Sequence, residues 1–265
     1  MSLDKLLERA LPVAQSAALA AGAVIDRYYR QTDIGLRIKN DRTPVTRADE
    51  ESEAAIRKTL THAFPEHAIF GEEGGHSGTS EFLWLVDPID GTKAFVRGYP
   101  VFSTQIALMV AGELCLGVSY ASAFGQMAWA TRGGGAFLNG AHCRMPICED
   151  WSQVALSTGN LKSLALDPVR WSRLGTLQAT ANRTRGYGDF YHYHLLATGG
   201  VDCVIESDVN ILDIAALAVI VREAGGVFTD LDGTELTLDT RSVLAAGLPA
   251  HHHALGTLRG LDSRS

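Results

Sequence analysis

The feature that most constrains this chain is the stretch WLVDPIDGTK, residues 84–93. It continues an apolar run that begins at Phe82, and such a run bounded by turn residues predicts a buried strand. At the end of the run, Asp87 and Asp90 stand on either side of a proline and Ile89. Carboxylates and backbone carbonyls are the ligands that hard divalent cations take. The stretch therefore predicts either a metal site at a strand end or an ordinary turn, because Asp, Pro and Gly are also common turn residues.

The next two residues, Gly91 and Thr92, predict the start of a helix-like turn. Free N–H groups at a helix start attract phosphate. One turn can therefore hold both a metal and the anion on which the metal acts.

Composition limits the class of protein. A chain of 265 residues that is 46% hydrophobic and 20% charged is globular and long enough to bury a large core. The net charge of −7 argues against nucleic acid or an anionic membrane as the main partner. No apolar run approaches the roughly 18 to 20 residues that span a bilayer. The four cysteines show no metal-ligand spacing, so a reducing cytoplasm is the expected compartment.

Hydrophobic periodicity predicts two subdomains, 1–145 and 146–265. The first is an N-terminal α+β subdomain, which is expected to carry the metal site, and the second is a C-terminal α/β subdomain, which is expected to complete the substrate cleft. Predicted helices are 3–30, a helix that starts after Thr46, 168–177, 189–198 and 213–224. Predicted strands are 68–70, 82–86, 102–110, 114–119, 126–131, 154–157, 201–206 and 242–246.

Acidic residues stand at the ends of several predicted elements. Asp49 follows Thr46 by three residues, which is the spacing of a capping box, and an isolated acid there would merely offset the helix dipole. Glu72 ends a short strand and Asp213 starts a helix, so both can converge with Asp87 and Asp90. Like charges about 4 Å apart repel by about 4 kcal/mol at an effective dielectric of 20. Two or three magnesium ions would make such a cluster tenable and suited to metal-assisted hydrolysis.

Several separated blocks resemble the signature blocks of the inositol monophosphatase superfamily. They are TPVTRAD at 43–49, GEE at 71–73, WLVDPIDGTKAF at 84–95 and NILDIAALAVIVREAGG at 210–226. The resemblance implies a layered αβαβα fold of the α/β (α+β) class, magnesium dependence, sensitivity to lithium and a homodimer.

The same resemblance assigns roles to single positions. It implies that the metal ligands are Glu72, Asp87, the Ile89 carbonyl, Asp90 and Asp213. Asp49 and Thr92 would orient and deprotonate the attacking water, and the Gly91 and Thr92 amides would hold the phosphate. One departure is visible, because the tryptophan usual before the last acid is Leu212 here.

Substrate choice is expected to come from Arg185, Asp189 and Glu206 in the second half of the chain. Two carboxylates suit a cationic alcohol better than a neutral polyol. The GDF pattern at 188–190 is similar to the histidinol-phosphate phosphatases of this superfamily. His192 and His194 are expected to be packing or surface residues on the helix that follows.

The leading hypothesis is a magnesium-dependent phosphomonoesterase that converts L-histidinol phosphate into L-histidinol and phosphate in histidine biosynthesis. Alternative substrates are inositol 1-monophosphate and phosphoadenosine phosphates. The competing class is a non-catalytic metal-binding relative. The expected partner is a small-molecule phosphate ester, with no nucleic acid and no membrane.

Overall fold

The structure, a computed structural model, describes residues 2–39 and 43–260. The chain divides into two compact units. The N-terminal unit is Met1–Ala141 with Leu212–Ile220, and the C-terminal unit is His142–Ile211 with Val221–Ser265. The sequence analysis predicted a single boundary, between residues 145 and 146. In the structure, the N-terminal unit also includes the segment Leu212–Ile220.

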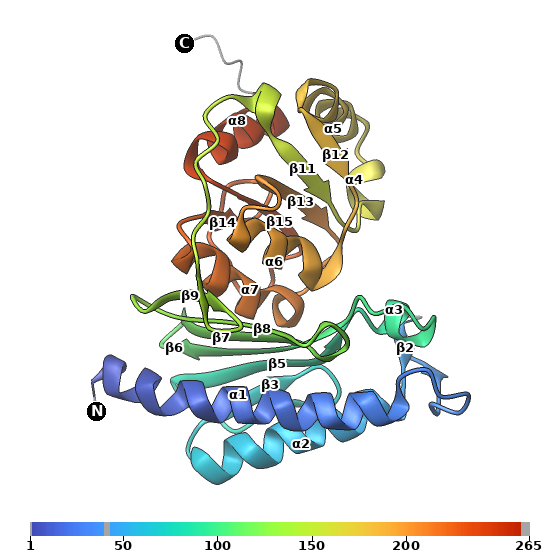
Figure 1. Cartoon of the computed structure of the whole chain (residues 1–265), viewed down its shortest axis with the longest axis vertical. Coiled ribbons are helices and arrows are strands. Elements are labelled where there is room, and N and C mark those ends of the chain that lie inside the picture. The colour runs from blue at the N-terminus through green and yellow to red at the C-terminus, as the bar shows by residue number, and fades with distance from the viewer. Residues whose placement is uncertain (1, 40–42, 261–265) are drawn as a thin grey trace. The chain divides into compact units, whose positions relative to one another are not determined.

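An eight-stranded sheet forms the centre of the N-terminal unit (Figure 1). Its strands run in the order β10-β9-β8-β7-β6-β5-β3-β4, and of these neighbours β3 and β5 are parallel. Their bounds are β3 Ala68–Gly71, β4 Gly75–Ser77, β5 Phe82–Asp90, β6 Ser103–Val110, β7 Glu113–Ala121, β8 Gln126–Thr131, β9 Gly135–Leu138 and β10 Ala141–Cys143. A separate two-stranded ladder joins β1 (Arg37–Ile38) to β2 (Pro44–Val45).

Two long helices, α1 (Leu3–Tyr28) and α2 (Arg47–Ala63), lie side by side on one face of this sheet (Figure 1). Leu116 and Val118 of β7 point into the core that these helices cover. Gly117 points to the opposite face, because side chains alternate along a strand. A Cβ on Gly117 would collide with the backbone of Ala216 in α7 (Ile211–Glu223), so this glycine allows α7 to lie directly on the sheet.

The C-terminal unit contains a five-stranded mixed sheet of order β12-β11-β13-β15-β14. β11 runs parallel to both β12 and β13, whereas β15 runs antiparallel to β13 and β14. The strands are β11 Ala155–Thr158, β12 Arg183–Arg185, β13 Cys203–Ser207, β14 Val227–Thr229 and β15 Ser242–Ala246. The helices are α4 Lys162–Ala165, α5 Pro168–Thr180, α6 Asp189–Thr198 and α8 Leu248–Arg259, with a 3-10 turn at Trp151–Gln153. A second 3-10 turn, Ser122–Phe124, belongs to the N-terminal unit.

One predicted boundary is wrong in a way that bears on function. The strand that begins at Phe82 does not end at Val86 but runs to Asp90 as β5. It stays paired with β6, since Asp87 lies opposite Gln105 and Asp90 opposite Ser103, with a bulge between the two aspartates. Proline has no N–H to donate to a ladder, so Pro88 is tolerated where the pairing is irregular. The aspartates are therefore held by a sheet and not by a free turn.

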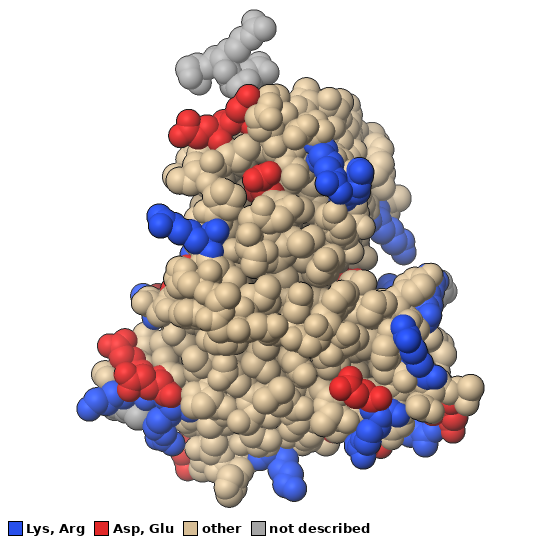
Figure 2. Space-filling view, viewed as in Figure 1, with Lys and Arg blue, Asp and Glu red and all other residues tan. Residues whose placement is uncertain are grey.

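The surface in Figure 2 is a mixture of charges. On the face shown, basic and acidic side chains are scattered between larger areas of uncharged residues. Within residues 2–39 and 43–260, no helix combines the length and apolar character needed to cross a bilayer.

Candidate active site

Three of the predicted metal ligands come together in the N-terminal unit. Asp87 and Asp90 come from the bulged end of β5, and Asp213 comes from the first turn of α7. One carboxylate oxygen from each lies within 4.8 Å of the others. Asp87 and Asp90 are buried, with 2% and 8% of their surface exposed. The sequence separates Asp213 from the other two by more than a hundred residues, and the packing of α7 on the sheet brings it to them.

Crowding and burial make this cluster electrostatically costly without a cation. Burial, followed by the charges of Glu72, Asp213 and Asp90, raises the pKa of Asp87 well above its ordinary value. A hard divalent cation removes this cost, because carboxylate oxygens are its preferred ligands. The residues present therefore fit a bound divalent metal.

Glu72 lies beside the cluster, directly after β3, and is close enough to Asp87 to contribute to its raised pKa. Lys39 Nζ lies 3.0 Å from Glu72 Oε1 and 2.6 Å from Glu73 Oε1. Burial raises the pKa of Glu73 to about 7 despite this contact. The ammonium group of Lys39 thus balances part of the negative charge at this end of the sheet.

Asp49 and Thr92 form a second pair of groups beside the bulge. The predicted capping box is confirmed: Asp49 Oδ2 accepts hydrogen bonds from Thr46 N at 2.7 Å and Thr46 Oγ1 at 2.6 Å. The other oxygen, Oδ1, lies 3.3 Å from Thr92 Oγ1, which is also 2.9 Å from the Ile89 carbonyl oxygen. Burial raises the pKa of Asp49 to about 6, although its hydrogen bonds with Thr46 oppose this shift. A carboxylate with such a pKa can act as a base near neutral pH.

Gly91 makes the turn that presents Thr92. Its φ of 85° lies in the left-handed region, and a Cβ would lie 2.6 Å from the Val101 carbonyl oxygen. Only glycine meets both demands without strain. The short helix α3 (Thr92–Val96) starts immediately after it, as predicted.

The three predicted substrate residues all lie in the C-terminal unit. Arg185 ends β12 and is exposed, and its Nη1 donates to the carbonyl of Thr184. Asp189 is half-buried at the start of α6 and has a φ of 47°, which is strained for a residue with a side chain. Glu206 is 2% exposed, and its Oε2 lies 3.1 Å from His192 Nε2.

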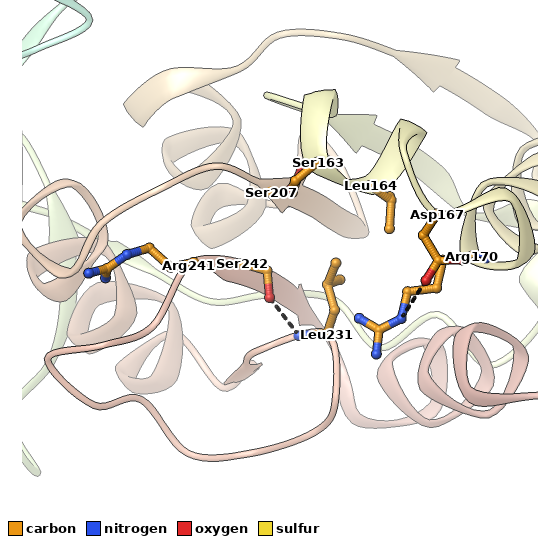
Figure 3. A pocket seen from close by; sticks show the side chains of 8 residues that line it. All are labelled: Ser163, Leu164, Asp167, Arg170, Ser207, Leu231, Arg241 and Ser242. Carbon is orange, nitrogen blue, oxygen red and sulfur yellow. Dashed lines mark hydrogen bonds and ion pairs between the residues drawn. The ribbon is translucent and has the colours of Figure 1, made fainter. Parts of the chain in front are cut away.

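A cavity of about 310 Å³ lies elsewhere in the C-terminal unit (Figure 3). None of the predicted site residues lines it. Its two arginines have partners within the unit: Arg170 pairs with Asp167 at 3.8 Å, and Arg241 donates to the Thr240 carbonyl at 2.7 Å. Figure 3 shows the Arg241 guanidinium pointing away from the other labelled side chains.

Sequence reasoning missed Lys39 and the partners of Glu206. Lys39 precedes the TPVTRAD block with no spacing or periodicity that would mark it. His192 was expected in packing or at the surface, and it proves to be fully buried and paired with Glu206. A buried histidine beside a buried acid cannot be read from a sequence in which the two are fourteen positions apart on different elements.

Comparisons with known proteins agree with this arrangement. A model of the inositol monophosphatase family matches residues 6–260. A histidinol-phosphatase of Streptomyces coelicolor is 41% identical over 232 residues, which cover 82% of this chain and 84% of that protein. The Nus factor SuhB of Pasteurella multocida is 35% identical, with 89% and 90% covered.

Solved structures confirm the predicted fold class. An inositol monophosphatase from Zymomonas mobilis superposes with a TM-score of 0.85 at 29% identity, covering 98% of this chain and 100% of that one. The mixed sheets of this chain, flanked by helices, therefore belong to an inositol monophosphatase fold. The family match, the fold and the clustered acids lead to one conclusion: the chain belongs to the inositol monophosphatase family of metal-dependent phosphatases.

Proposed function

We propose that this protein is a magnesium-dependent phosphomonoesterase that hydrolyses L-histidinol phosphate to L-histidinol and phosphate. The observation that carries the chemistry is the position of Thr92 Oγ1, which lies between the Asp49 carboxylate and the Ile89 carbonyl at the bulge that holds Asp87 and Asp90. We further propose that the enzyme acts in histidine biosynthesis, in the cytoplasm and as a homodimer.

The proposed metal ligands are the Asp87, Asp90 and Asp213 carboxylates, with Glu72 and the Ile89 carbonyl completing the set for two or three magnesium ions. Magnesium bound there would lower the pKa of the attacking water and neutralise charge on the phosphate and the leaving oxygen. The acidic cluster supports a hard divalent cation, because it offers oxygen ligands only.

Thr92 and Asp49 are proposed to remove the proton from the attacking water. Thr92 Oγ1 accepts a hydrogen bond from the attacking water and passes a proton to Asp49 Oδ1, which has a pKa of about 6 because it is buried. The water oxygen then bonds to phosphorus and the bond from phosphorus to the alcohol oxygen breaks. The departing oxygen takes a proton from solvent, so the products are the alcohol and inorganic phosphate. Thr46 keeps Asp49 in place through two hydrogen bonds to Oδ2.

The phosphate itself is proposed to accept hydrogen bonds from the main-chain amides of Gly91 and Thr92. Gly91 supports this role because its left-handed φ of 85° turns the chain sharply at this point. Backbone N–H groups exposed by such a turn are suited to bind an anion.

The alcohol part is proposed to be recognised by Arg185 and Asp189, and the third predicted substrate residue, Glu206, to support them from within the C-terminal unit. L-Histidinol carries an amine, and a carboxylate favours a cation over a neutral polyol. Asp189 supports this choice because it is only half-buried and its strained backbone is of the kind found at functional positions. The similarity to the histidinol-phosphatase of Streptomyces coelicolor supports the same substrate.

A panel of phosphate esters tests the proposal. We expect L-histidinol phosphate to be hydrolysed with a higher kcat/KM than inositol 1-phosphate or 3′-phosphoadenosine 5′-phosphate, and the activity to be lost in EDTA and restored by magnesium. Preference for inositol 1-phosphate would favour the second candidate, which the solved inositol monophosphatase structure supports. Release of no phosphate from any ester would identify a binding protein. Thr92→Ala is the catalytic control. Thr257→Ala, in the last turn of α8, is its matched control, because it also removes one threonine hydroxyl that bonds a nearby carbonyl.

A further inference from the structure

Glu206 is the centre of a buried hydrogen-bond network in the C-terminal unit. Its Oε2 accepts a hydrogen bond from the Tyr193 hydroxyl at 2.8 Å and lies 3.1 Å from His192 Nε2. Its Oε1 accepts from the backbone N–H of Asn160 at 3.2 Å and from the Asn160 side-chain amide at 3.4 Å. Both oxygens are thus occupied by groups of the protein itself.

The network extends through His192 to the turn before α6. Ser157 Oγ lies 3.3 Å from His192 Nδ1 and accepts a hydrogen bond from the Tyr187 backbone N–H at 3.4 Å. A neutral His192 with its proton on Nε2 donates to Glu206 and accepts from the Ser157 hydroxyl. Each group in the chain then donates to the next: the Tyr187 N–H to Ser157 Oγ, the Ser157 hydroxyl to His192 Nδ1, and His192 Nε2–H to Glu206.

Close packing around Glu206 also limits the movement of its carboxylate. Gly159 leaves the space that the carboxylate occupies, since a Cβ there would collide with Glu206 Oε1. The Tyr193 ring that donates to Glu206 is itself stacked on Phe228, with ring centroids 5.5 Å apart. His192 and Glu206 are 0% and 2% exposed. The carboxylate therefore has little freedom to turn toward a bound molecule.

The segments held by this network are those that follow the parallel strands. Asn160 follows β11, and Tyr187 lies between β12 and α6, two residues before Asp189. Ligand groups in sheets with parallel strands are usually placed at the carboxyl ends of those strands. The network thus ties together the turns that carry the candidate substrate residue Asp189.

We propose that Glu206 and His192 are positioning residues, which hold the turn from Tyr187 to Asp189 in the geometry that binds the alcohol part of the substrate. Glu206 acts through its hydrogen bonds and does not contact the substrate amine, so Asp189 alone supplies the opposing charge. This inference rests on the proposed function, and it revises the expectation that Glu206 binds the substrate directly.

Four variants separate positioning from charge recognition. Glu206→Gln keeps an acceptor for Asn160, and its amide group can donate to the Tyr193 hydroxyl and to the reversed tautomer of His192. It therefore keeps these contacts, with two of the donor and acceptor roles exchanged, and removes the charge. His192→Leu and Ser157→Ala break the network but leave the charge of Glu206. Asp189→Asn removes the charge assigned to substrate recognition. The substrates are L-histidinol phosphate and phenyl phosphate, whose alcohol part carries no charge.

We expect Glu206→Gln to stay within about threefold of wild type on both esters, because the Gln side chain has the same shape and keeps a hydrogen-bond contact with each partner. His192→Leu should raise KM for L-histidinol phosphate about tenfold with little change in kcat, and Ser157→Ala should do so more weakly. Activity on phenyl phosphate should stay near wild type for all of them, which a merely misfolded protein would not show. Asp189→Asn should lower kcat/KM for the cationic ester selectively.

Two results overturn the inference: a Glu206→Gln variant that loses as much preference for the cationic ester as Asp189→Asn, or His192→Leu and Ser157→Ala variants with unchanged KM. If His192→Leu does not fold, Ser157→Ala decides, since it removes a single hydroxyl. If the wild type hydrolyses phenyl phosphate but not L-histidinol phosphate, the proposed function fails instead. In that case, KM of His192→Leu and of Ser157→Ala is compared with wild type on whichever phosphate ester the wild type hydrolyses best. An unchanged KM would refute the proposal that His192 and Glu206 position the substrate-binding turn.

Discussion

Three carboxylates crowded into one site should destabilise the protein when no metal is bound. Oxygens of Asp87, Asp90 and Asp213 lie within 4.8 Å of one another. Two unit charges at such a distance repel by about 3.5 kcal/mol at an effective dielectric of 20. Asp213→Asn keeps the size of the side chain and removes its charge from two such pairs. Protonation of Asp87, whose pKa is raised by burial and its acidic neighbours, already relieves part of the repulsion. We therefore expect a net gain of about 2 kcal/mol.

Melting temperatures measured with EDTA and with magnesium test this directly. In EDTA, Asp213→Asn should melt about 4 to 8 °C above wild type. Magnesium at a hundredfold excess over its Kd should stabilise the wild type by about 2.7 kcal/mol, whereas the variant lacks one ligand and should gain much less. Asp239→Asn, which removes an exposed acid, is the matched control and should melt like wild type in both conditions.

The refuting results are distinct. If Asp213→Asn melts below wild type in EDTA, the carboxylate stabilises the metal-free protein and the repulsion argument is wrong. If the variant gains as much from magnesium as wild type does, Asp213 is not a ligand.

Three further predictions concern catalysis and stability. Asp49→Asn should lower kcat about 10²- to 10⁴-fold with little change in KM, because Asn cannot accept the proton, and steady-state kinetics with saturating magnesium would measure this. An unchanged kcat would remove Asp49 from the mechanism. Gly91→Ala should destabilise the protein by about 1 to 3 kcal/mol in urea unfolding, because φ is 85° and the new Cβ meets the Val101 carbonyl, and wild-type stability would contradict this. Burial lowers the pKa of His194 to about 3 from an ordinary value of 6.5, so the unfolded chain binds a proton first and stability is lost as the pH falls below about 6.5. Between about pH 7.5 and pH 5 the wild type should therefore lose about 2 kcal/mol more than His194→Leu, and equal losses would show that His194 is not the cause.

Local patterns were sufficient where neighbouring residues decide the structure. The capping box of Thr46 and Asp49 is formed by residues three apart, and the structure confirms it. The helix Asp189–Thr198 was predicted with its observed bounds, its end being marked by Gly199 and Gly200. Strand β8 likewise begins and ends where the alternating pattern does.

Long-range pairing decided the features that the sequence did not reveal. The extension of β5 to Asp90 depends on its bulged ladder with β6, whose partners Gln105 and Ser103 lie beyond a helix. The convergence of Asp213 with Asp87 was inferred from element ends and from resemblance, since no spacing links them. The contacts of Glu206 with His192 and Asn160 required the packing of β13 against α6 and β11.

Because a chain is synthesised from its N-terminus, the α7 segment Leu212–Ile220 leaves the ribosome long after the sheet against which it packs. Until then, α7 does not cover the sheet face around Gly117, which is exposed to solvent, and the acidic cluster lacks Asp213. Nascent chains with uncovered apolar surface are prone to aggregate and are natural clients of chaperones. A fragment that ends at Ala141 would lack both the α7 segment and Asp213, so truncation there removes part of the N-terminal unit and one acid of its proposed metal site.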